Sequence, residues 1–406
     1  MKKNNTKLTN LLLIVSFIIL VFGSGYKLGE YKNRLNFLQS TSFSKSTNRQ
    51  TNINFDLFWD TWSKLQERYV DQKKIDPKKM YYGAIKGMVA SVEDPYTFFL
   101  TPEENKQTKD DLGGKFEGIG AQLGLKDNRI VIIAPLKKSP AELAGVMAGD
   151  IVDKVDDLST KNWALTQAVS KIRGPKNTKV KLTLERNNKE IVVTIIRQQI
   201  IISSVELSYD KSIAVLKVNQ FGDNTNDEWN KAVDQIRNNW LNKQINGLVL
   251  DLRDNPGGYL ESSVYLASEF LPLEKLVVKQ EATLYGDKEY RVSKIGKLQD
   301  IPLSVLINKG SASASEILAG ALRDHKRAQL IGEKSFGKGS VQEALDLREG
   351  AGLHVTVAKW VLPNGDWINN KGIEPNIKIV NEVKEGNTIT KESDKQLEKA
   401  IEILTK

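Results

Sequence analysis

Beyond residue 200 the sequence alternates between short apolar runs and amphipathic helical segments, and this alternation constrains the fold more than any other feature. GLVLDLRD (247–254) and PLSVLINKG (302–310) are near-continuous apolar runs, as expected for strands buried on both faces. NDEWNKAVDQIRNN (226–239) and LESSVYLASEFL (260–271) have helical periodicity, and KQLEKAIEIL (395–404) indicates a closing amphipathic helix. The pattern predicts a layered α/β core.

A shorter, strand-rich segment precedes this core. NRIVIIAPL (128–136) indicates a strand, and WALTQAVSKI (163–172) an amphipathic helix. KVKLTLER and KEIVVTIIR predict a hairpin around the dipeptide Asn187-Asn188. Residues 116–198 are therefore expected to form one compact module of strands with two helices.

The N-terminal end carries a membrane signal. Residues 8–26 contain no charged side chain, and Lys2, Lys3 and Lys7 precede them. This length approaches the ~20 residues that span a bilayer as a helix, and the flanking charge predicts a cytoplasmic N-terminus with the rest outside. A cleaved signal peptide is the alternative, since Gly23 and Gly25 form a small-x-small pair.

The chain is thus expected to be a multidomain protein of mixed α+β class. A Ser/Thr/Asn-rich tether follows the apolar segment, and apolar residues then recur at helical spacing. The expected parts are a cytoplasmic basic tip (1–7), a transmembrane signal anchor (8–26), a tether (27–53), an N-terminal helical region (54–112), the compact module (116–198), the α/β core (199–380), and a C-terminal tail and helix (381–406).

Composition removes several classes of function. The sequence has no cysteine, which excludes a thiol nucleophile and cysteine-ligated zinc. Its net charge is +9, but the basic residues are interleaved with acids rather than arranged in a stripe with aromatics, so no nucleic-acid partner is expected. No cluster of metal ligands is evident, and we expect neither a metal nor an organic cofactor.

The segment NKGSASASEILAGAL (308–322) combines a strand end, a tight turn and a helix start. Ser313 and Glu316 match the capping box S-x-x-E, which is a structural role. The same position suits a nucleophile, because unpaired N–H groups at a helix N-terminus can hold an oxyanion. The residues alone leave both interpretations open.

A nucleophilic serine requires a base, and the chain offers few. The only histidines are His325 and His354, and neither has a convincing carboxylate partner nearby in sequence. Lys338, in the uncharged context SFGKGSV, could serve if burial keeps it neutral. Lys217 and Lys359 are equally free of charged neighbours, so composition does not choose among them.

Several segments together resemble the C-terminal processing, or tail-specific, proteases, a family of Ser–Lys peptidases with a PDZ domain. The resemblance covers nearly all of the chain after the tether. It implies a ClpP/crotonase-like protease core preceded by a helical region and a PDZ domain. The segments that carry it are GSASASEILAGAL with FGKGSVQ, MYYGAIKGMVASVEDPYTFFLTPEE, FEGIGAQLGL with SPAELAGVMAGDIVDKVD, VLDLRDNPGG and KGIEPNI.

The resemblance also implies roles for individual residues. Ser313 matches the nucleophile, Lys338 the general base, and Gln342 the glutamine that orients the lysine. The backbone amides of Ala314 and of Gly257 or Gly258 match the oxyanion hole, and Glu316 matches a supporting residue. In the PDZ domain, the loop Gly118, Ile119, Gly120 and Ala121 matches the site that cradles a peptide carboxylate.

The implied activity is that of a membrane-tethered serine endopeptidase working outside the cytoplasmic membrane. Its partners would be protein or peptide substrates with free apolar C-termini, and the charged C-terminal tail is compatible with a homo-oligomer. Arg173, which follows the groove helix of the PDZ domain, is expected to contact the core when peptide binds. The alternatives are a non-catalytic PDZ adaptor and a Ser–His hydrolase that uses His325 or His354.

Overall fold

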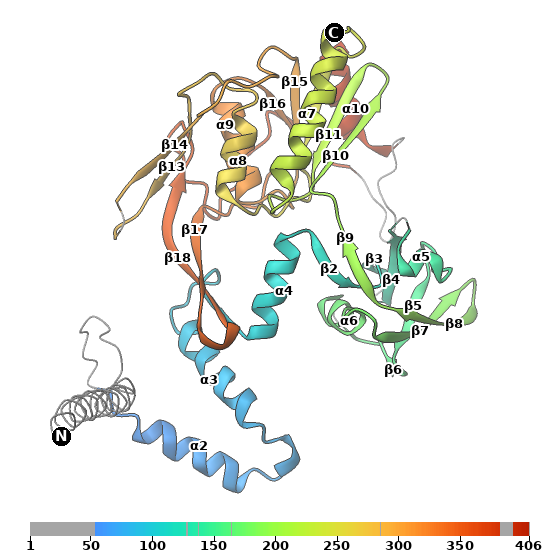
Figure 1. Ribbon diagram of the computed structural model, residues 1–406, viewed down its shortest axis with the longest axis vertical. Helices are drawn as coiled ribbons and strands as arrows, with labels where there is room; N and C mark the ends of the chain where they lie inside the picture. The colour runs from blue at the N-terminus through green and yellow to red at the C-terminus, as the bar shows by residue number, and fades with distance from the viewer. Residues whose placement is uncertain are drawn as a thin grey trace, which may run out of the picture. The chain divides into compact units, whose positions relative to one another are not determined.

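The structure is a computed structural model that describes residues 53–126, 129–136, 138–163, 165–284, 286–381 and 393–405 (Figure 1). It divides into two compact units, residues 1–76 and 77–406. The described part of the first unit consists of helix α2 (Asp56–Arg68) and a short 3-10 turn, η1 (Gln72–Lys74). The expected membrane segment 8–26 lies outside the described residues, and no helix within them is long and apolar enough to cross a bilayer.

A six-stranded sheet forms the centre of the second unit. Its order is β10-β11-β12-β15-β16-β19, and all neighbours run parallel except the antiparallel pair β10 and β11. Every residue of β12 and β15 is buried, as the continuous apolar runs predicted. The strands are β10 (Val205–Asp210), β11 (Ile213–Val218), β12 (Gly247–Asp251), β15 (Leu303–Ile307), β16 (Gln329–Gly332) and β19 (Ile377–Lys378).

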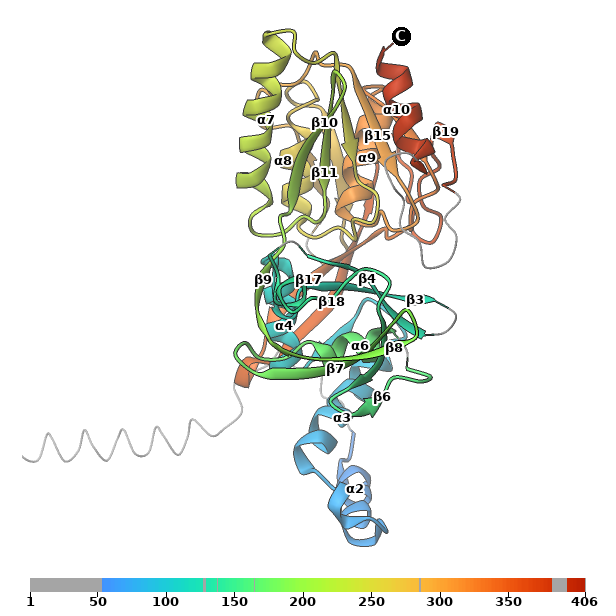
Figure 2. The ribbon, with the colours of Figure 1, turned by 90° about the vertical axis from the view of Figure 1, so that its right-hand side faces the viewer.

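Helices cover both faces of this sheet, which confirms the layered core. Alternate strand residues such as Leu216 and Leu250 face the large core cluster, whereas Val215 and Val249 pack with Ile401 of the last helix. Figure 2 shows α7 and α10 on opposite sides of the strands. The helices are α7 (Thr225–Leu241), α8 (Leu260–Ala267), α9 (Ala314–Asp324) and α10 (Lys395–Thr405).

A second, five-stranded sheet was not predicted. Its long strand β18 pairs with β17, β1 and β13, and β13 pairs with β14. Strand β1 lies inside the region that was expected to be helical. It could not be predicted from its own residues, because they form a strand only by pairing with a segment about 250 residues later. The elements are α3 (Pro77–Ala90), β1 (Phe98–Leu100), α4 (Pro102–Leu112), β13 (Leu276–Glu281), β14 (Lys288–Arg291), β17 (Ser340–Asp346), η2 (Arg348–Gly350) and β18 (Gly352–Val361).

The module between residues 119 and 197 has its own sheet, in the order β3-β4-β5-β7-β8, and its own hydrophobic core. The predicted hairpin is present, and Asn187 and Asn188 both adopt positive φ at its turn, 50° and 59°. The elements are β3 (Ala121–Lys126), β4 (Arg129–Pro135), α5 (Pro140–Leu143), β5 (Ile151–Val155), β6 (Leu158–Ser159), α6 (Leu165–Ile172), β7 (Lys179–Arg186) and β8 (Lys189–Ile196).

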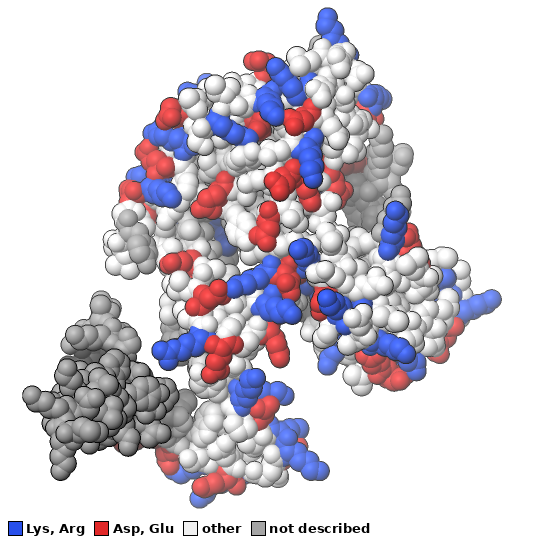
Figure 3. Space-filling model, viewed as in Figure 1, with Lys and Arg blue, Asp and Glu red and all other residues white. Residues whose placement is uncertain are grey.

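Two short strands join this module to the rest of the second unit. They are β2 (Lys115–Gly118) and β9 (Gln198–Ile201), which pair antiparallel with Gly118 opposite Gln198. The chain therefore enters and leaves the module at the same place. On the face drawn in Figure 3, basic and acidic side chains are interleaved over the surface, as the sequence indicated.

Candidate active site

The three serines of the turn between β15 and α9 have different surroundings. Ser311 and Ser315 are fully buried, and their hydroxyls donate to the carbonyls of Leu252 and Asn255 at 2.8 and 2.9 Å. Ser313 is only half-buried and has φ 55° and ψ −116°, a backbone conformation that costs a non-glycine residue energy. The fold therefore uses its outer serines to fix the turn and presents the middle one at the surface.

Glu316 ties the turn of Ser313 to the loop of Lys338. Its carboxylate is buried and accepts from the amides of Ser313 at 2.8 Å, Gly337 at 2.7 Å and Lys338 at 2.9 Å. It also accepts from the Ser335 hydroxyl at 2.5 Å. Burial raises the pKa of Glu316 although these hydrogen bonds act against the rise. One carboxylate thus fixes the backbone of two chemically important positions.

Lys338 is half-buried on the loop that precedes β17. Burial lowers the pKa of its side chain, and the charges of Asp94 and Glu316 oppose that shift. Its Nζ atom lies 5.1 Å from the ring centroid of Tyr96. Among the hydrogen bonds of the described residues, none joins Lys338 to the Ser313 hydroxyl.

Gln342 lies on β17, four residues after the lysine. Its side-chain amide donates to the hydroxyls of Ser340 at 2.9 Å and Thr356 at 3.1 Å. Gln342 is close to Lys338 in sequence, but in the structure its side chain pairs with Ser340 and Thr356 and not with the lysine.

The two glycines of NPGG approach the serine differently. Gly257 has φ 102°, and a Cβ atom there would lie 2.8 Å from Ser313 Cβ and 3.1 Å from the Ala314 nitrogen. Its own N–H donates to the side chain of Asn255 at 2.9 Å. The Gly257 donor is thus already used, whereas no hydrogen bond among the described residues uses the N–H of Gly258.

The loop of Gly118, Ile119, Gly120 and Ala121 connects β2 to β3. Ile119 is buried, and Gly120 has φ 72° with no room for a side chain, since a Cβ would lie 2.5 Å from Ser139 Cβ. Strand β3 is at the edge of its sheet and lies beside α6. An edge strand next to a helix is the arrangement that admits an added peptide strand.

Comparisons with known proteins agree with these observations. A model of peptidase family S41 matches residues 212–379, a PDZ domain model matches residues 104–185, and a model of the N-terminal domain of activating protease CtpB matches residues 18–104. The chain belongs to the C-terminal processing proteases. Members of this family bind substrate C-termini through their PDZ domain.

Two relatives illustrate the similarity. The chain is 40% identical over 311 residues to a probable CtpA-like serine protease of Staphylococcus haemolyticus, covering 76% of this chain and 61% of that protein. It is 38% identical over 321 residues to carboxy-terminal processing protease CtpB of Bacillus subtilis, covering 78% and 65%. The match thus spans less than two thirds of these relatives.

Among solved structures, the photosystem II D1 C-terminal processing protease resembles this chain with a TM-score of 0.52. The two are 28% identical, and the match covers 86% of this chain and 97% of that one.

The two histidines lie in different surroundings, His325 at the end of α9 and His354 on β18. His325 caps the C-terminal end of α9, about 18 Å along the helix from Ser313, and its ring bonds the Leu276 carbonyl at 2.7 Å. His354 stacks on Phe98 at 4.7 Å. Burial, and then the charge of Lys338, lower the pKa of His354. Within the described residues, neither ring is hydrogen-bonded to an acid.

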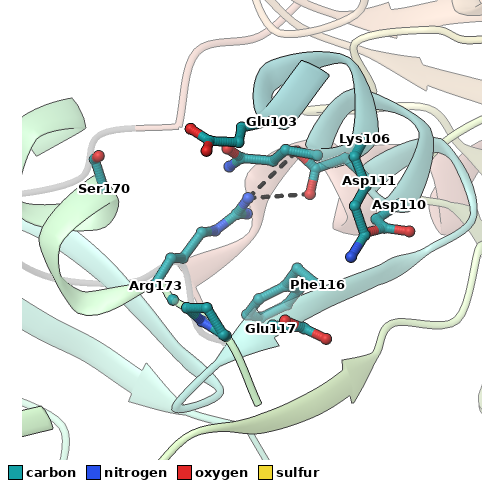
Figure 4. A pocket seen from close by; sticks show the side chains of 11 residues that line it. Glu103, Lys106, Asp110, Asp111, Phe116, Glu117, Ser170 and Arg173 are labelled. Atoms are coloured by element: carbon teal, nitrogen blue, oxygen red, sulfur yellow. Dashed lines mark hydrogen bonds and ion pairs between the residues drawn. The ribbon is translucent and has the colours of Figure 1, made fainter. Parts of the chain in front are cut away.

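Arg173 contacts α4 rather than the α/β core. Its guanidinium pairs with Asp111 at 3.0 Å and lies over the ring of Phe116 at 4.7 Å. These residues line a pocket of about 370 Å³ between α4 and the end of α6, in which Arg173 points at Asp111 (Figure 4). The side chain of Arg173 also lies beside the loop of Gly118 to Ala121. A Cβ atom built on Gly118 would be 3.7 Å from Arg173 Cγ.

Helix α4 in turn contacts β17, the strand that follows Lys338. Lys109 pairs with Asp346 at the end of β17 at 2.6 Å, and Asn105 bonds Asp346 at 3.1 Å. The structure thus connects the PDZ loop to β17 through one helix. Sequence reasoning missed this helix contact and the residues around Lys338, because each pairs segments that are distant in sequence.

Proposed function

We propose that this chain is a serine endopeptidase that binds the C-terminal tail of a substrate in its PDZ domain and cleaves the chain by a Ser–Lys mechanism. The observation that carries the proposal is the pairing of a strained, half-exposed Ser313 with a half-buried Lys338 on the same buried carboxylate, Glu316. Strain and shared positioning of two reactive groups are typical of active sites.

The chemistry follows from these positions. Ser313 Oγ attacks the scissile carbonyl carbon while neutral Lys338 accepts the hydroxyl proton. The resulting oxyanion is held by the amides of Ala314 and Gly258. When the tetrahedral intermediate collapses, the C–N bond breaks and Lys338 returns its proton to the leaving amine. Water, activated by the same lysine, then hydrolyses the acyl-enzyme and frees Ser313.

Substrate selection is assigned to the groove between β3 and α6. Leu165 and Val169 of α6 are partly exposed and suit an apolar C-terminal side chain, and the backbone of the loop at Gly118 to Ala121 suits the carboxylate. Because Arg173 lies beside that loop and pairs with α4, peptide binding can alter the contact between α4 and β17. The proposal therefore includes a PDZ domain that regulates the protease.

The proposal also places the enzyme at a membrane. The uncharged residues 8–26 and the preceding lysines support a signal anchor with the protease on the extracytoplasmic side. Full-length protein should fractionate with membranes and be digested by external protease after about residue 30. A mature chain that begins near Tyr26 would show a cleaved signal instead.

The test of activity uses the full-length chain with matched peptides. A peptide ending in Ala or Val should be cleaved, and the same peptide extended by two aspartates should be cleaved far more slowly. New C-termini are identified by mass spectrometry, and the Ser313→Ala variant, which lacks the proposed nucleophile, is the negative control. Equal rates for both peptides would remove the tail-recognition proposal, and no cleavage of either would favour the adaptor.

The histidine alternative is tested in the same assay. Neither ring has a carboxylate partner among the described residues, so His325→Ala and His354→Ala should keep most of the activity. A folded but inactive histidine variant would return the question to a Ser–His hydrolase.

A further inference from the structure

The side chain of Lys338 contacts a turn that the proposed mechanism does not use. This turn, Asp94 to Thr97, connects α3 to β1. The 5.1 Å from Lys338 Nζ to the Tyr96 ring centroid is a cation–π distance. Asp94 contributes a second attraction through its charge. The lysine thus experiences both an aromatic face and the charge of a carboxylate, and both favour a cation.

The turn itself is well fixed. Asp94 accepts hydrogen bonds from the Tyr96 amide at 3.1 Å and the Thr97 hydroxyl at 2.6 Å. The Thr97 hydroxyl in turn accepts from the Thr356 amide on β18 at 3.1 Å. Burial alone would raise the pKa of Asp94, but hydrogen bonds from Thr356 and Thr97 outweigh it and hold that pKa below its usual value. Asp94 is therefore a fixed negative charge beside the lysine.

Part of this environment opposes the role of a general base. A lysine can accept the Ser313 proton only when it is neutral. Burial favours the neutral form and lowers the pKa of Lys338, but Tyr96 and Asp94 act against burial and stabilise the ammonium form. The other titratable groups that face Lys338 are Glu316 and His354. Among the hydrogen bonds of the described residues, none joins Lys338 to Gln342, whose amide nitrogen donates to Ser340 and Thr356. The ring of Tyr96 and the charge of Asp94 thus favour a resting position of the lysine side chain over a productive one.

We propose that the turn Asp94–Thr97 is a resting seat for the Lys338 side chain, in which Tyr96 and Asp94 hold it as an ammonium away from Ser313. Activation requires the side chain to leave this seat, release its proton to water and turn toward the serine. Tyr96 and Asp94 are therefore positioning residues that act on the reaction through Lys338. This inference rests on the proposed Ser–Lys function.

The test compares Tyr96→Leu, which removes the aromatic face, with Tyr96→Phe, which keeps it. The readout is the rate at which an alkyl fluorophosphonate labels Ser313 in the full-length chain without peptide, measured from neutral to alkaline pH. Tyr96→Leu should be labelled on the order of fivefold faster, with the rise in rate shifted to lower pH, whereas Tyr96→Phe should behave as wild type. Asp94→Asn should shift the profile in the same direction as Tyr96→Leu.

The outcomes separate this inference from the proposed function. Slower labelling of Tyr96→Leu at every pH would show that the ring supports the productive position, and unchanged rates in both the leucine and asparagine variants would show that the turn does not hold the lysine. Either result overturns the resting seat alone, provided that wild type cleaves peptide. A wild-type chain that neither labels at Ser313 nor cleaves peptide overturns both. If Tyr96→Leu fails to fold, Asp94→Asn decides.

Discussion

Replacing Glu316 with glutamine should weaken both the fold and the nucleophile. Each carboxylate oxygen accepts two hydrogen bonds: Oε1 from Ser335 and Gly337, and Oε2 from Ser313 and Lys338. A glutamine keeps one oxygen but places an NH2 group where the other was. In the place of Oε2 that group faces the amides of Ser313 and Lys338, and both bonds are lost; in the place of Oε1 it faces the Gly337 amide, whose bond is lost, and the Ser335 hydroxyl, which can turn to accept.

The size of the effect follows from those bonds. A hydrogen bond to a charged group contributes about 1.5–3 kcal/mol, so one or two lost bonds cost about 1.5–6 kcal/mol. Burying a neutral amide is easier than burying the carboxylate, whose pKa burial already raises, and this offsets part of the loss. We expect a decrease near 3 kcal/mol, a large share of the ~5–15 kcal/mol that holds a typical protein folded.

The assay is urea unfolding of the full-length chain followed by tryptophan fluorescence, in which the buried Trp229 and Trp360 report on the core. Ser313 labelling by a fluorophosphonate is measured below the unfolding transition. Ser335→Ala, which removes only one donor to the carboxylate, is the matched control and should shift the midpoint by less. An unchanged midpoint together with unchanged labelling in Glu316→Gln would refute the reasoning.

Three further predictions concern the base, the oxyanion loop and the PDZ contact. Lys338→Arg should abolish turnover, because arginine stays protonated, and wild-type activity should rise with pH through a lysine pKa below its ordinary value; an active arginine variant contradicts this. Gly257→Ala should be inactive because its Cβ would meet Ser313, whereas Gly365→Ala, at φ 89° with open space, should stay active; equal activities would disprove the close approach. Arg173→Ala should change the ratio of peptide-stimulated to basal cleavage, and Arg129→Ala, which loses ion pairs within the PDZ domain, should not; matching ratios in all three enzymes would exclude a role for the Asp111 contact.

The parts of the fold that sequence predicted are those with local periodicity. The buried runs of β12 and β15 and the helix α7 are visible in a few neighbouring residues, so their assignment needs no knowledge of partners. The hairpin at Asn187-Asn188 was visible for the same reason, since its turn requires positive φ.

The parts that escaped prediction depend on distant pairing. Strand β1 exists because Phe98 pairs with His354, and the Tyr96 contact to Lys338 likewise joins remote segments. Gln342 shows a further limit, since its place in the sequence does not determine whether its amide meets the lysine or Thr356. In the sequence, DPYT is only a part of the longer segment that resembles the family, whereas in the structure its Tyr96 lies against Lys338.

The paired strands β2 and β9 make the tail-reading module a cassette. Gly118 and Gln198 lie opposite each other, about 5 Å apart. The residues between them therefore start and end at the same place on the rest of the chain. A different module with similarly close ends can be exchanged at this point without lengthening or rerouting the α/β core. Under the proposed function, such an exchange would change which protein tails are selected, and it would keep the regulation only if the new module also paired with Asp111 as Arg173 does.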